Sequence, residues 1–249
     1  MLIQSDYHIH ASFYRIKGPS AEPGPTAKEQ LAAARNAGSR FVGLLEHCNA
    51  SPKHPFSCLE ELSAEYHASD FDRHEVFLGV EADLAEDGSD ACGQTGREKL
   101  GLHYVIGSVH ISPAEVTDCR KYIEIEHQRI VRALKYNDNV DIIGHPFGEG
   151  FRFANTGRIQ KWNWSLIPPD YLEEILLLAK ESEKALEINR CDFDDPCYRE
   201  FLQKIRAQDI LFSIGSDAHD TKDVALARSR TETLNQLGFQ EQFHWKIDR

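Results

Sequence analysis

Short β-branched or aromatic segments alternate with longer segments of helical periodicity along the whole chain, and this alternation limits the possible folds more than any other feature. Strands are expected at residues 2–8, 40–45, 76–81, 104–109, 140–144, 185–188 and 210–214. Strands separated by helices form parallel sheets with right-handed crossovers. The pattern therefore predicts an α/β protein, either an open doubly wound sheet or a closed barrel.

Capping residues mark where several of the intervening helices begin. Thr26 and Glu29 form a capping box before a helix over residues 27–37, and Gly38 stands where a C-terminal glycine is favoured. Further helices are expected to start at Ser57 and run to about Ala68, at Asp118 and run to Lys135, at Asp170 and run to Glu181, at Asp195-Pro196, and near Thr221.

The chain is expected to form one domain over residues 1–249, because no linker, repeat or low-complexity tract divides it. Its longest irregular segment is 147–169, which contains Trp162 and Trp164; these indoles could cover a pocket or pack on the barrel. No GxGxxG or Walker-type loop follows the first strand, which weakens the nucleotide-binding version of an open sheet.

Charge and cysteine content narrow the class of protein. The chain has 28 Lys and Arg against 40 Asp and Glu, a net charge of −12, so binding to long nucleic acid is disfavoured. No apolar run is long enough to span a bilayer, and polar residues interrupt the N-terminal segment, so neither a membrane protein nor a secreted precursor is expected. Six cysteines without a CxxC pair are typical of reduced thiols in the cytoplasm.

Polar side chains gather where each predicted strand ends. Six of the twelve histidines follow strands, and carboxylates accompany them; the histidines are His8, His10, His47, His110, His145 and His219. In parallel α/β folds the carboxyl ends of the strands form the edge at which ligands bind. The other histidines (His54, His67, His74, His103, His127 and His244) fall elsewhere and are expected to be solvated or locally hydrogen-bonded.

The spacing of two ligand pairs points to metal ions. In the His8-x-His10 pair and in the Asp217-x-His219 pair, alternate side chains face the same way across roughly 6.5 Å of strand. Burying these groups together without a cation would leave charges and donors uncompensated. Mixed His and carboxylate ligands suit Zn, Mn or Fe, and the number of ligands exceeds what one ion takes, so two or three divalent ions are expected.

The ordered set of strand-end motifs resembles the PHP (polymerase and histidinol phosphatase) superfamily, and within it the histidinol-phosphate phosphatases. The matching segments, in family order, are Asp6-x-His8-x-His10, Glu46-His47, Gly79–Asp83, Tyr104–His110, Ile143–His145, Glu187–Asn189 and Gly215–His219. The resemblance implies a distorted (β/α)7 TIM-like barrel that holds two or three metals.

The resemblance also implies roles for individual residues. His8, His10, Glu81 and Asp217 would hold a first metal, and Glu81, His110 and His145 a second, with Glu81 bridging. His47 and His219 would contribute to a third. The ligand that the family supplies shortly after the first HxH is missing from residues 11–18, and Glu22 is the nearest carboxylate that could replace it.

These residues predict metal-dependent hydrolysis of a small phosphorylated metabolite, with histidinol phosphate as the named candidate. Asp217, His219 or a water on a third metal would protonate the leaving group. Arg15 and Arg190 are the first choices to bind the phosphate, followed by Arg152, Arg158 and Lys161. Two alternatives remain open: a hydrolase acting on another phosphorylated metabolite, a nucleotide or a nucleic-acid end, and a non-catalytic binding module.

Overall fold

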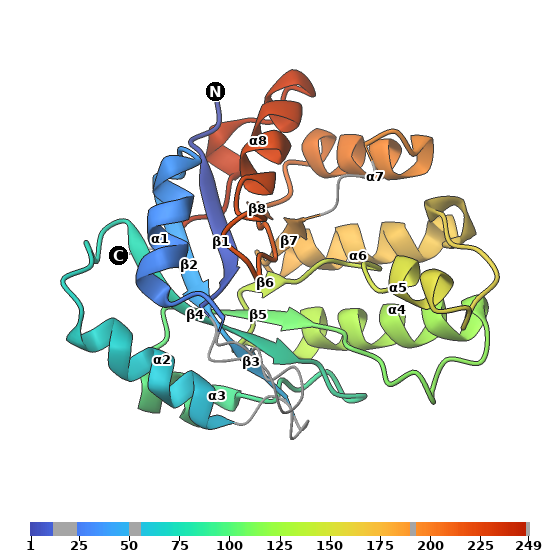
Figure 1. Ribbon diagram of the computed structural model, residues 1–249. Helices are drawn as coiled ribbons and strands as arrows, with labels where there is room; N and C mark the ends of the chain where they lie inside the picture. The colour runs from blue at the N-terminus through green and yellow to red at the C-terminus, as the bar shows by residue number, and fades with distance from the viewer. Residues whose placement is uncertain (12–23, 50–55, 190–192, 248–249) are drawn as a thin grey trace.

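The computed structural model describes residues 1–11, 24–49, 56–189 and 193–247, and it contains a strand at each of the seven expected places. All neighbouring strands pair in parallel (Figure 1). In sheet order they are β1 (Ser5–His10), β2 (Phe41–Leu45), β4 (Val76–Asp83), β5 (Tyr104–Ser108), β6 (Ile142–Ile143), β7 (Ala185–Ile188) and β8 (Phe212–Ile214).

The sheet curves round until its last strand meets its first. Beyond the end of β8, Ala218 forms a parallel bridge with Ile9 of β1. His10 N donates to Ala218 O at 2.9 Å, and Ala218 N donates to His8 O at 3.3 Å. The predicted distorted (β/α)7 TIM-like barrel is therefore confirmed, and the open doubly wound alternative is wrong.

A register irregularity in β1 decides which of its side chains face the barrel interior. Asp6 pairs with Val42 and Ile9 with Leu44, so β1 has one more residue than β2 between these two pairs. A bulge of this kind re-aims the side chains that follow it. Tyr7 packs with the residues inside the barrel, whereas Ile9, two positions later, packs on the outer side under the helices. This shift brings His8 and His10 to the interior.

The second strand is interrupted at Glu46, which the sequence did not predict. After β2 ends at Leu45, a two-residue strand β3 (His47–Cys48) resumes pairing with β4 and places His47 opposite Glu81. The first strand also differs from its expected bounds of 2–8, because the contacts of Ile9 and His10 with Leu44, Leu45 and Ala218 extend it to His10.

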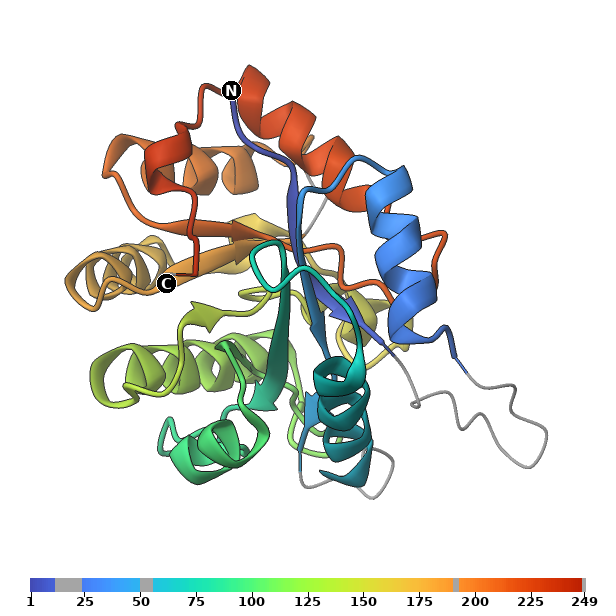
Figure 2. The ribbon, with the colours of Figure 1, turned by 90° about the vertical axis from the view of Figure 1, so that its left-hand side faces the viewer.

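Helices surround the barrel on its outer side (Figure 2). Their bounds are α1 Ala27–Asn36, α2 Phe56–Ala68, α3 Gly93–Leu100, α4 Cys119–Tyr136, α5 Gly150–Asn155, α6 Pro169–Glu181, α7 Pro196–Ala207 and α8 Leu226–Gln236, with 3-10 turns η2 Trp164–Leu166 and η3 Glu241–Phe243. Within the described part of the chain, no helix combines the length and the apolar character needed to cross a membrane.

The predicted caps are correct at three helices and wrong at three. Thr26 and Glu29 form the capping box of α1, Asp118 accepts from Lys121 N, and Asp195 accepts from Cys197 N and Tyr198 N. At the other three helices, Ser57 and Asp170 lie inside the first turns of α2 and α6, and residues 221–225 form turns before α8.

Two helices, α3 and α5, and the 3-10 turn η2 were not predicted from the sequence. The glycines of α3 hide its helical pattern in the sequence, and the segment 147–169, expected to be irregular, contains α5 and η2. In that segment Trp162 packs on Tyr122 and Trp164 on Tyr198, with exposed fractions of 5% and 2%. Of the two expectations for these indoles, covering a pocket or packing on the barrel, the structure confirms the packing.

An apolar plug fills the barrel below the histidines. Tyr104 lies at its centre and donates from its hydroxyl to Tyr7 O at 2.6 Å. At the amino ends of the strands, Trp245 N donates to Phe212 O at 2.8 Å and the indole packs edge-on against Tyr7. The C-terminal segment thus closes the end of the barrel that is opposite the strand-end histidines.

Gly79→Ala tests the packing of this plug. A Cβ at Gly79 would lie closer to the Tyr104 ring than real Cβ atoms come to a neighbour, and the ring is fixed by its hydrogen bond to Tyr7 O. We expect the free energy of unfolding in urea to fall by about 1–3 kcal/mol, the usual cost of overpacking a core. A fall of less than about 0.5 kcal/mol, which is typical of a surface substitution, would contradict this packing.

His244→Phe tests a pH dependence at the closed end. His244 Nε2 lies 2.8 Å from Ser5 Oγ, the ring stacks on Phe212, and burial lowers its pKa from 6.5 to about 4. The unfolded chain then binds more protons than the native protein between these values, so native stability is complete above pH 6.5 and is lost as the pH falls toward 4. Urea titrations should show a smaller loss over this range in the variant, by up to about 3 kcal/mol; equal losses would contradict the assignment.

Candidate metal centre

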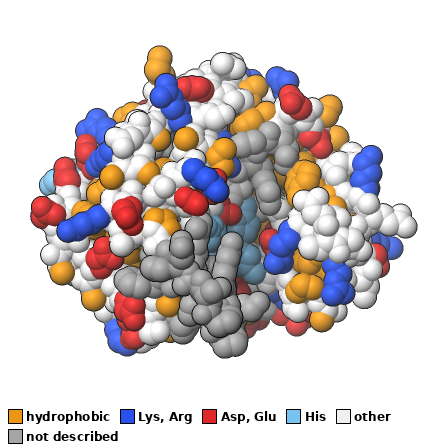
Figure 3. Space-filling model, viewed as in Figure 1, with side chains coloured by type: hydrophobic (Ala, Val, Ile, Leu, Met, Phe, Trp, Pro, Cys, Tyr) orange, Lys and Arg blue, Asp and Glu red, His pale blue; other side chains and the backbone are white. Residues whose placement is uncertain are grey.

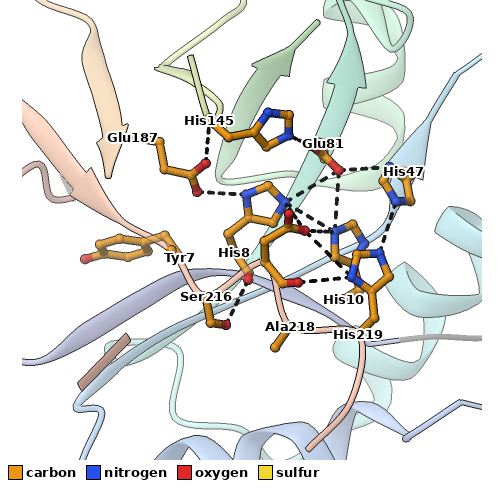
Figure 4. A network of polar contacts seen from close by, with 12 residues as sticks. Tyr7, His8, His10, His47, Glu81, His145, Glu187, Ser216, Ala218 and His219 are labelled. Atoms are coloured by element: carbon orange, nitrogen blue, oxygen red, sulfur yellow. Dashed lines mark hydrogen bonds and ion pairs between the residues drawn. The ribbon is translucent and has the colours of Figure 1, made fainter. Parts of the chain in front are cut away.

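One buried carboxylate, Glu81 of β4, lies at the centre of the strand-end histidines (Figure 4). Its Oε2 atom is 2.8 Å from His47 Nδ1, 3.4 Å from His10 Nε2 and 3.5 Å from His8 Nε2. Its Oε1 atom is 2.8 Å from His145 Nε2 and 3.4 Å from His110 Nε2. The two oxygens therefore face five imidazoles from four different segments of the chain.

The residues predicted to hold a first ion are brought together as expected. One potential ligand atom from each of His8, His10, Glu81 and Asp217 lies within 4.8 Å of the others. Asp217 Oδ1 is 3.5 Å from His8 Nε2 and 3.4 Å from His10 Nε2, and these two nitrogens are 3.2 Å apart. Such converging ring nitrogens and carboxylate oxygens form a compact mixed donor set.

Glu81, His110 and His145, the set predicted for a second ion, also meet, because both imidazoles reach the same Glu81 oxygen. The pair predicted for a third ion is extended: His47 and His219, whose Nε2 atoms are 3.4 Å apart, gather with His10. His47 in addition gathers with Glu81 and His110. Glu22 lies outside the described residues.

The centre is buried on most sides and opens on one. His8, His10 and Glu81 are inaccessible to solvent, whereas the side chains of Asp217 and His219 keep exposed fractions of 37% and 36%. Histidine side chains are visible at the bottom of a depression in the surface (Figure 3). Asp217 and His219 therefore stand at the side from which a small molecule could approach.

Ionisation of the central groups reflects their mutual proximity. Burial raises the pKa of Glu81, but the charges of His110, His47 and His8 outweigh it and hold this pKa well below its usual range. Burial lowers the pKa of His10, but hydrogen bonding to Asp217 and Glu81 raises it to about 9, and the charge of Glu81 with the Asp83 hydrogen bond raises that of His110 to about 10.

The imidazoles of His47 and His219 stay neutral. Burial lowers the pKa of His47 to about 3, and the charge of His10 followed by burial lowers that of His219 to about 4. Without cations, the centre therefore compensates its carboxylates with protons on some rings and leaves other rings as neutral donors. Divalent cations would replace those protons, because metal ligands bind in their deprotonated forms.

The donor set fits such ions. Imidazole nitrogens and carboxylate oxygens are suitable ligands for Zn²⁺, Mn²⁺ and Fe²⁺. Glu81 Oε2 makes no hydrogen bond of regular geometry within the described part of the chain, although three imidazole nitrogens lie within 3.5 Å. Short approaches without hydrogen-bond geometry are expected where ligand atoms converge on an ion rather than on one another.

Comparisons with known proteins point to one family. No family model matches the chain. It is 27% identical over 237 residues to a probable phosphatase of Caldicellulosiruptor saccharolyticus, a match that covers 90% of this chain and 84% of that protein. It is 24% identical over 251 residues to the DNA polymerase/3'-5' exonuclease PolX of Bacillus subtilis, a match that covers 94% of this chain and 39% of PolX.

Among solved structures, the chain is similar to the histidinol phosphate phosphatase of Lactococcus lactis, whose crystal structure contains Zn, L-histidinol and phosphate. The TM-score is 0.62 at 19% identity, covering 96% of this chain and 95% of that one. PolX contains a PHP domain, and the phosphatase is a PHP family member with a TIM-like barrel. The chain is therefore similar, in sequence and in fold, to proteins of the PHP superfamily.

Three carboxylates contact the strand-end histidines, and none of the three was assigned a role from the sequence. Glu187 Oε1 is 2.7 Å from His8 Nδ1, Asp83 Oδ1 is 2.7 Å from His110 Nδ1, and Glu46 Oε2 is 4.0 Å from His10 Nδ1. Burial raises the pKa of Glu46 to about 7. Two signals in the sequence pointed to them: their positions at the ends of β7, β4 and β2, and their place in the segments that resemble the PHP superfamily.

The predicted phosphate-binding arginines, Arg15 and Arg190, lie outside the described residues. Of the second choices, Arg152 donates to Ile111 O at 3.3 Å, next to His110, and pairs with Glu149. Arg158 and Lys161 are exposed and line a surface pocket beside the start of α4. Neither Arg158 nor Lys161 contacts the strand-end histidines.

The remaining described histidines have local partners, as expected. His67 Nε2 is 3.2 Å from Leu100 O, His103 Nδ1 is 3.2 Å from Leu78 O, and His127 Nε2 is 3.1 Å from Glu174 Oε2. His54 lies outside the described residues. The five cysteines that the described segments include (Cys48, Cys58, Cys92, Cys119 and Cys197) are free thiols.

Glu81→Gln tests whether the centre binds divalent cations through its central carboxylate. An ion that binds only the native state stabilises it by about 2.7 kcal/mol per site at 100-fold excess over Kd. We expect wild-type protein to gain about this much in the free energy of unfolding when Zn²⁺ is added, and the variant to gain less than about 1 kcal/mol. Glu232→Gln, on the exposed face of α8, is the matched control; an equal gain in Glu81→Gln would contradict the prediction.

Proposed function

We propose that this protein is a metal-dependent phosphatase that hydrolyses a small phosphate monoester. The observation that carries the proposal is the position of Glu81, whose two oxygens face the first and second ligand sets at once. A carboxylate shared by two ions is the arrangement used for phosphate-ester cleavage. The similarity to a probable phosphatase supports the same reaction class.

In this proposal the ligand sets are those expected from the sequence: His8, His10, Glu81 and Asp217; Glu81, His110 and His145; and His47 with His219, joined by His10. Bound divalent ions would lower the pKa of water and offset the charge of a phosphoryl group. Zn, Mn and Fe fit the donors equally well, and the Lactococcus enzyme crystallised with Zn.

The chain's own residues would handle the proton and the substrate. Asp217 and His219 stand at the open side, and their side chains lie close together, with Asp217 Oδ1 3.7 Å from His219 Nδ1. In this proposal one of the two accepts the proton that the attacking water gives up and passes it to the leaving alkoxide. The neutral state of His219 in the absence of ions leaves its ring available as a base or a ligand. The buried walls formed by His8, His10 and Glu81 exclude water from the other sides.

Histidinol phosphate is the first substrate to test, because the fold matches that of a histidinol phosphate phosphatase. A nucleotide or nucleic-acid end is the second, because the chain is also similar to PolX. The net charge of −12 disfavours long nucleic acid over a small phosphorylated metabolite. We place the activity in the cytoplasm on the basis of the free cysteines.

The decisive experiment measures metal content and phosphate release together. We expect at least two ions per chain by elemental analysis, and release of phosphate from one member of a panel of histidinol phosphate, sugar phosphates and nucleotides. Fewer than two ions, with no turnover after Mn²⁺, Zn²⁺ or Fe²⁺ is added, would refute the proposal. A far better sugar phosphate or nucleotide substrate would exclude histidinol phosphate but leave the reaction class intact.

His110→Ala should reduce kcat by about 100-fold or more, since a metal supplies several kcal/mol of charge stabilisation. The side chain is 24% exposed, so its removal should change the fold little, which circular dichroism can check. His127→Ala, at a histidine buried between α4 and α6 and away from the centre, is the matched control and should keep wild-type turnover. Full activity in His110→Ala would remove this residue from the second ligand set.

A further inference from the structure

The turn that carries His145 has a backbone conformation that needs outside support. His145 has φ 27° and Phe147 has φ 57°, both in the left-handed region that side-chain-bearing residues rarely adopt. Pro146 between them has no N–H to donate. The turn therefore has two N–H groups, those of His145 and Phe147, with which the rest of the protein can hold it.

Both of these N–H groups donate to buried carboxylates from other elements. His145 N donates to Glu187 Oε2 of β7 at 2.8 Å, and Phe147 N donates to Glu126 Oε1 of α4 at 2.8 Å. Glu126 is inaccessible to solvent, and the Glu187 side chain is 1% exposed. Charged acceptors make hydrogen bonds roughly twice as strong as neutral ones. Burial raises the pKa of Glu126 to about 7, so Glu126 contributes less of this added strength to the turn than a fully ionised carboxylate would.

Glu187 has a second contact that Glu126 lacks. Its Oε1 atom lies 2.7 Å from His8 Nδ1, on the far side of the ring from Glu81 and Asp217 (Figure 4). The carboxylate is held in place by close packing, since a Cβ at Gly215 would overlap Glu187 Oε1. One carboxylate therefore contacts a ligand ring of the first set and the backbone of a ligand in the second.

The contact with His8 has a chemical consequence for that ring. A carboxylate only accepts hydrogen bonds, so a neutral His8 must carry its proton on Nδ1 and present a lone pair at Nε2. Nε2 is the nitrogen that faces His10, Glu81 and Asp217. A carboxylate behind a ligand histidine fixes both its tautomer and its ring orientation.

We propose that Glu187 is a positioning residue that serves both ligand sets at once, by fixing the tautomer of His8 and holding the turn of His145. This inference rests on the proposed function, because it concerns the residues that would hold the ions. Glu187 would then couple the two ligand sets. It contacts one residue of each set from behind, whereas Glu81 lies between the sets.

Replacement by glutamine separates this role from ordinary packing. The two contacts of Glu187 need two acceptor atoms, and an amide has only one. In Glu187→Gln, either the amide nitrogen faces His8 Nδ1 and moves the ring proton to Nε2, or it faces His145 N and leaves that donor without a partner. Each orientation impairs one ligand set.

Glu126→Gln is the matched control. Glu126 needs a single acceptor for Phe147 N, and its Oε2 has no hydrogen-bond partner within the described part of the chain. The amide oxygen can replace Oε1, so the same chemical change should leave the turn intact. A purely structural requirement for a buried negative charge would affect both variants alike.

The test measures Zn²⁺ and Mn²⁺ binding to metal-free protein by calorimetry. For Glu187→Gln we expect at least one ion to bind about 10–100-fold more weakly than in wild type, the usual effect of losing a partner behind a ligand. For Glu126→Gln we expect affinities within about twofold of wild type. Equal isotherms for Glu187→Gln and wild type, or equal losses in the two variants, would overturn the proposal.

If Glu187→Gln does not fold, the comparison moves to Glu187→Asp and Glu126→Asp, which keep two acceptors on a side chain one methylene shorter. The weaker binding should then appear in Glu187→Asp only. Because binding is measured without substrate, the outcome is independent of turnover. A wild-type protein that binds ions but releases no phosphate would refute the proposed function and leave the role of Glu187 standing.

Discussion

The structure depends on the burial of one carboxylate, Glu81, among five imidazoles. An isolated buried carboxylate would cost several kcal/mol, and the rings around it, with or without cations, supply the compensation. These rings come from β1, β3 and the segments after β5 and β6, so the charge at Glu81 is balanced only when these strands are assembled around β4. The centre therefore depends on the assembly of this part of the sheet.

Much of this arrangement could be predicted from the sequence because it follows from topology. Parallel strands separated by helices bring their carboxyl ends to one edge, so His8, His110 and Asp217 had to approach one another once the strands were located. Topology alone left an open sheet and a barrel as alternatives, and the family resemblance implied the barrel and the first ligand set. The caps at Thr26, Asp118 and Asp195 were predictable for a different reason, since they depend only on neighbours a few residues away.

What the sequence did not predict depends on local departures from regular geometry. The bulge in β1 and the break at Glu46 have no compositional signature, yet they decide which side chains face the barrel interior. Glu187 stands in a family-like segment at a strand end, but its contacts could not be predicted, because its two partners are 42 and 179 positions away. Contacts at such separation become visible only when the turn at His145 is seen in place.

The aromatic plug below the centre has a consequence for how the site exchanges its contents. With Tyr104 filling the barrel and Trp245 closing its other end, the depression beside Asp217 and His219 is the approach that the described residues leave to the histidines. In the proposed reaction, ions and substrate would enter from this same side. A bound substrate would then lie between the ions and solvent and would slow the removal of the ions by a chelator.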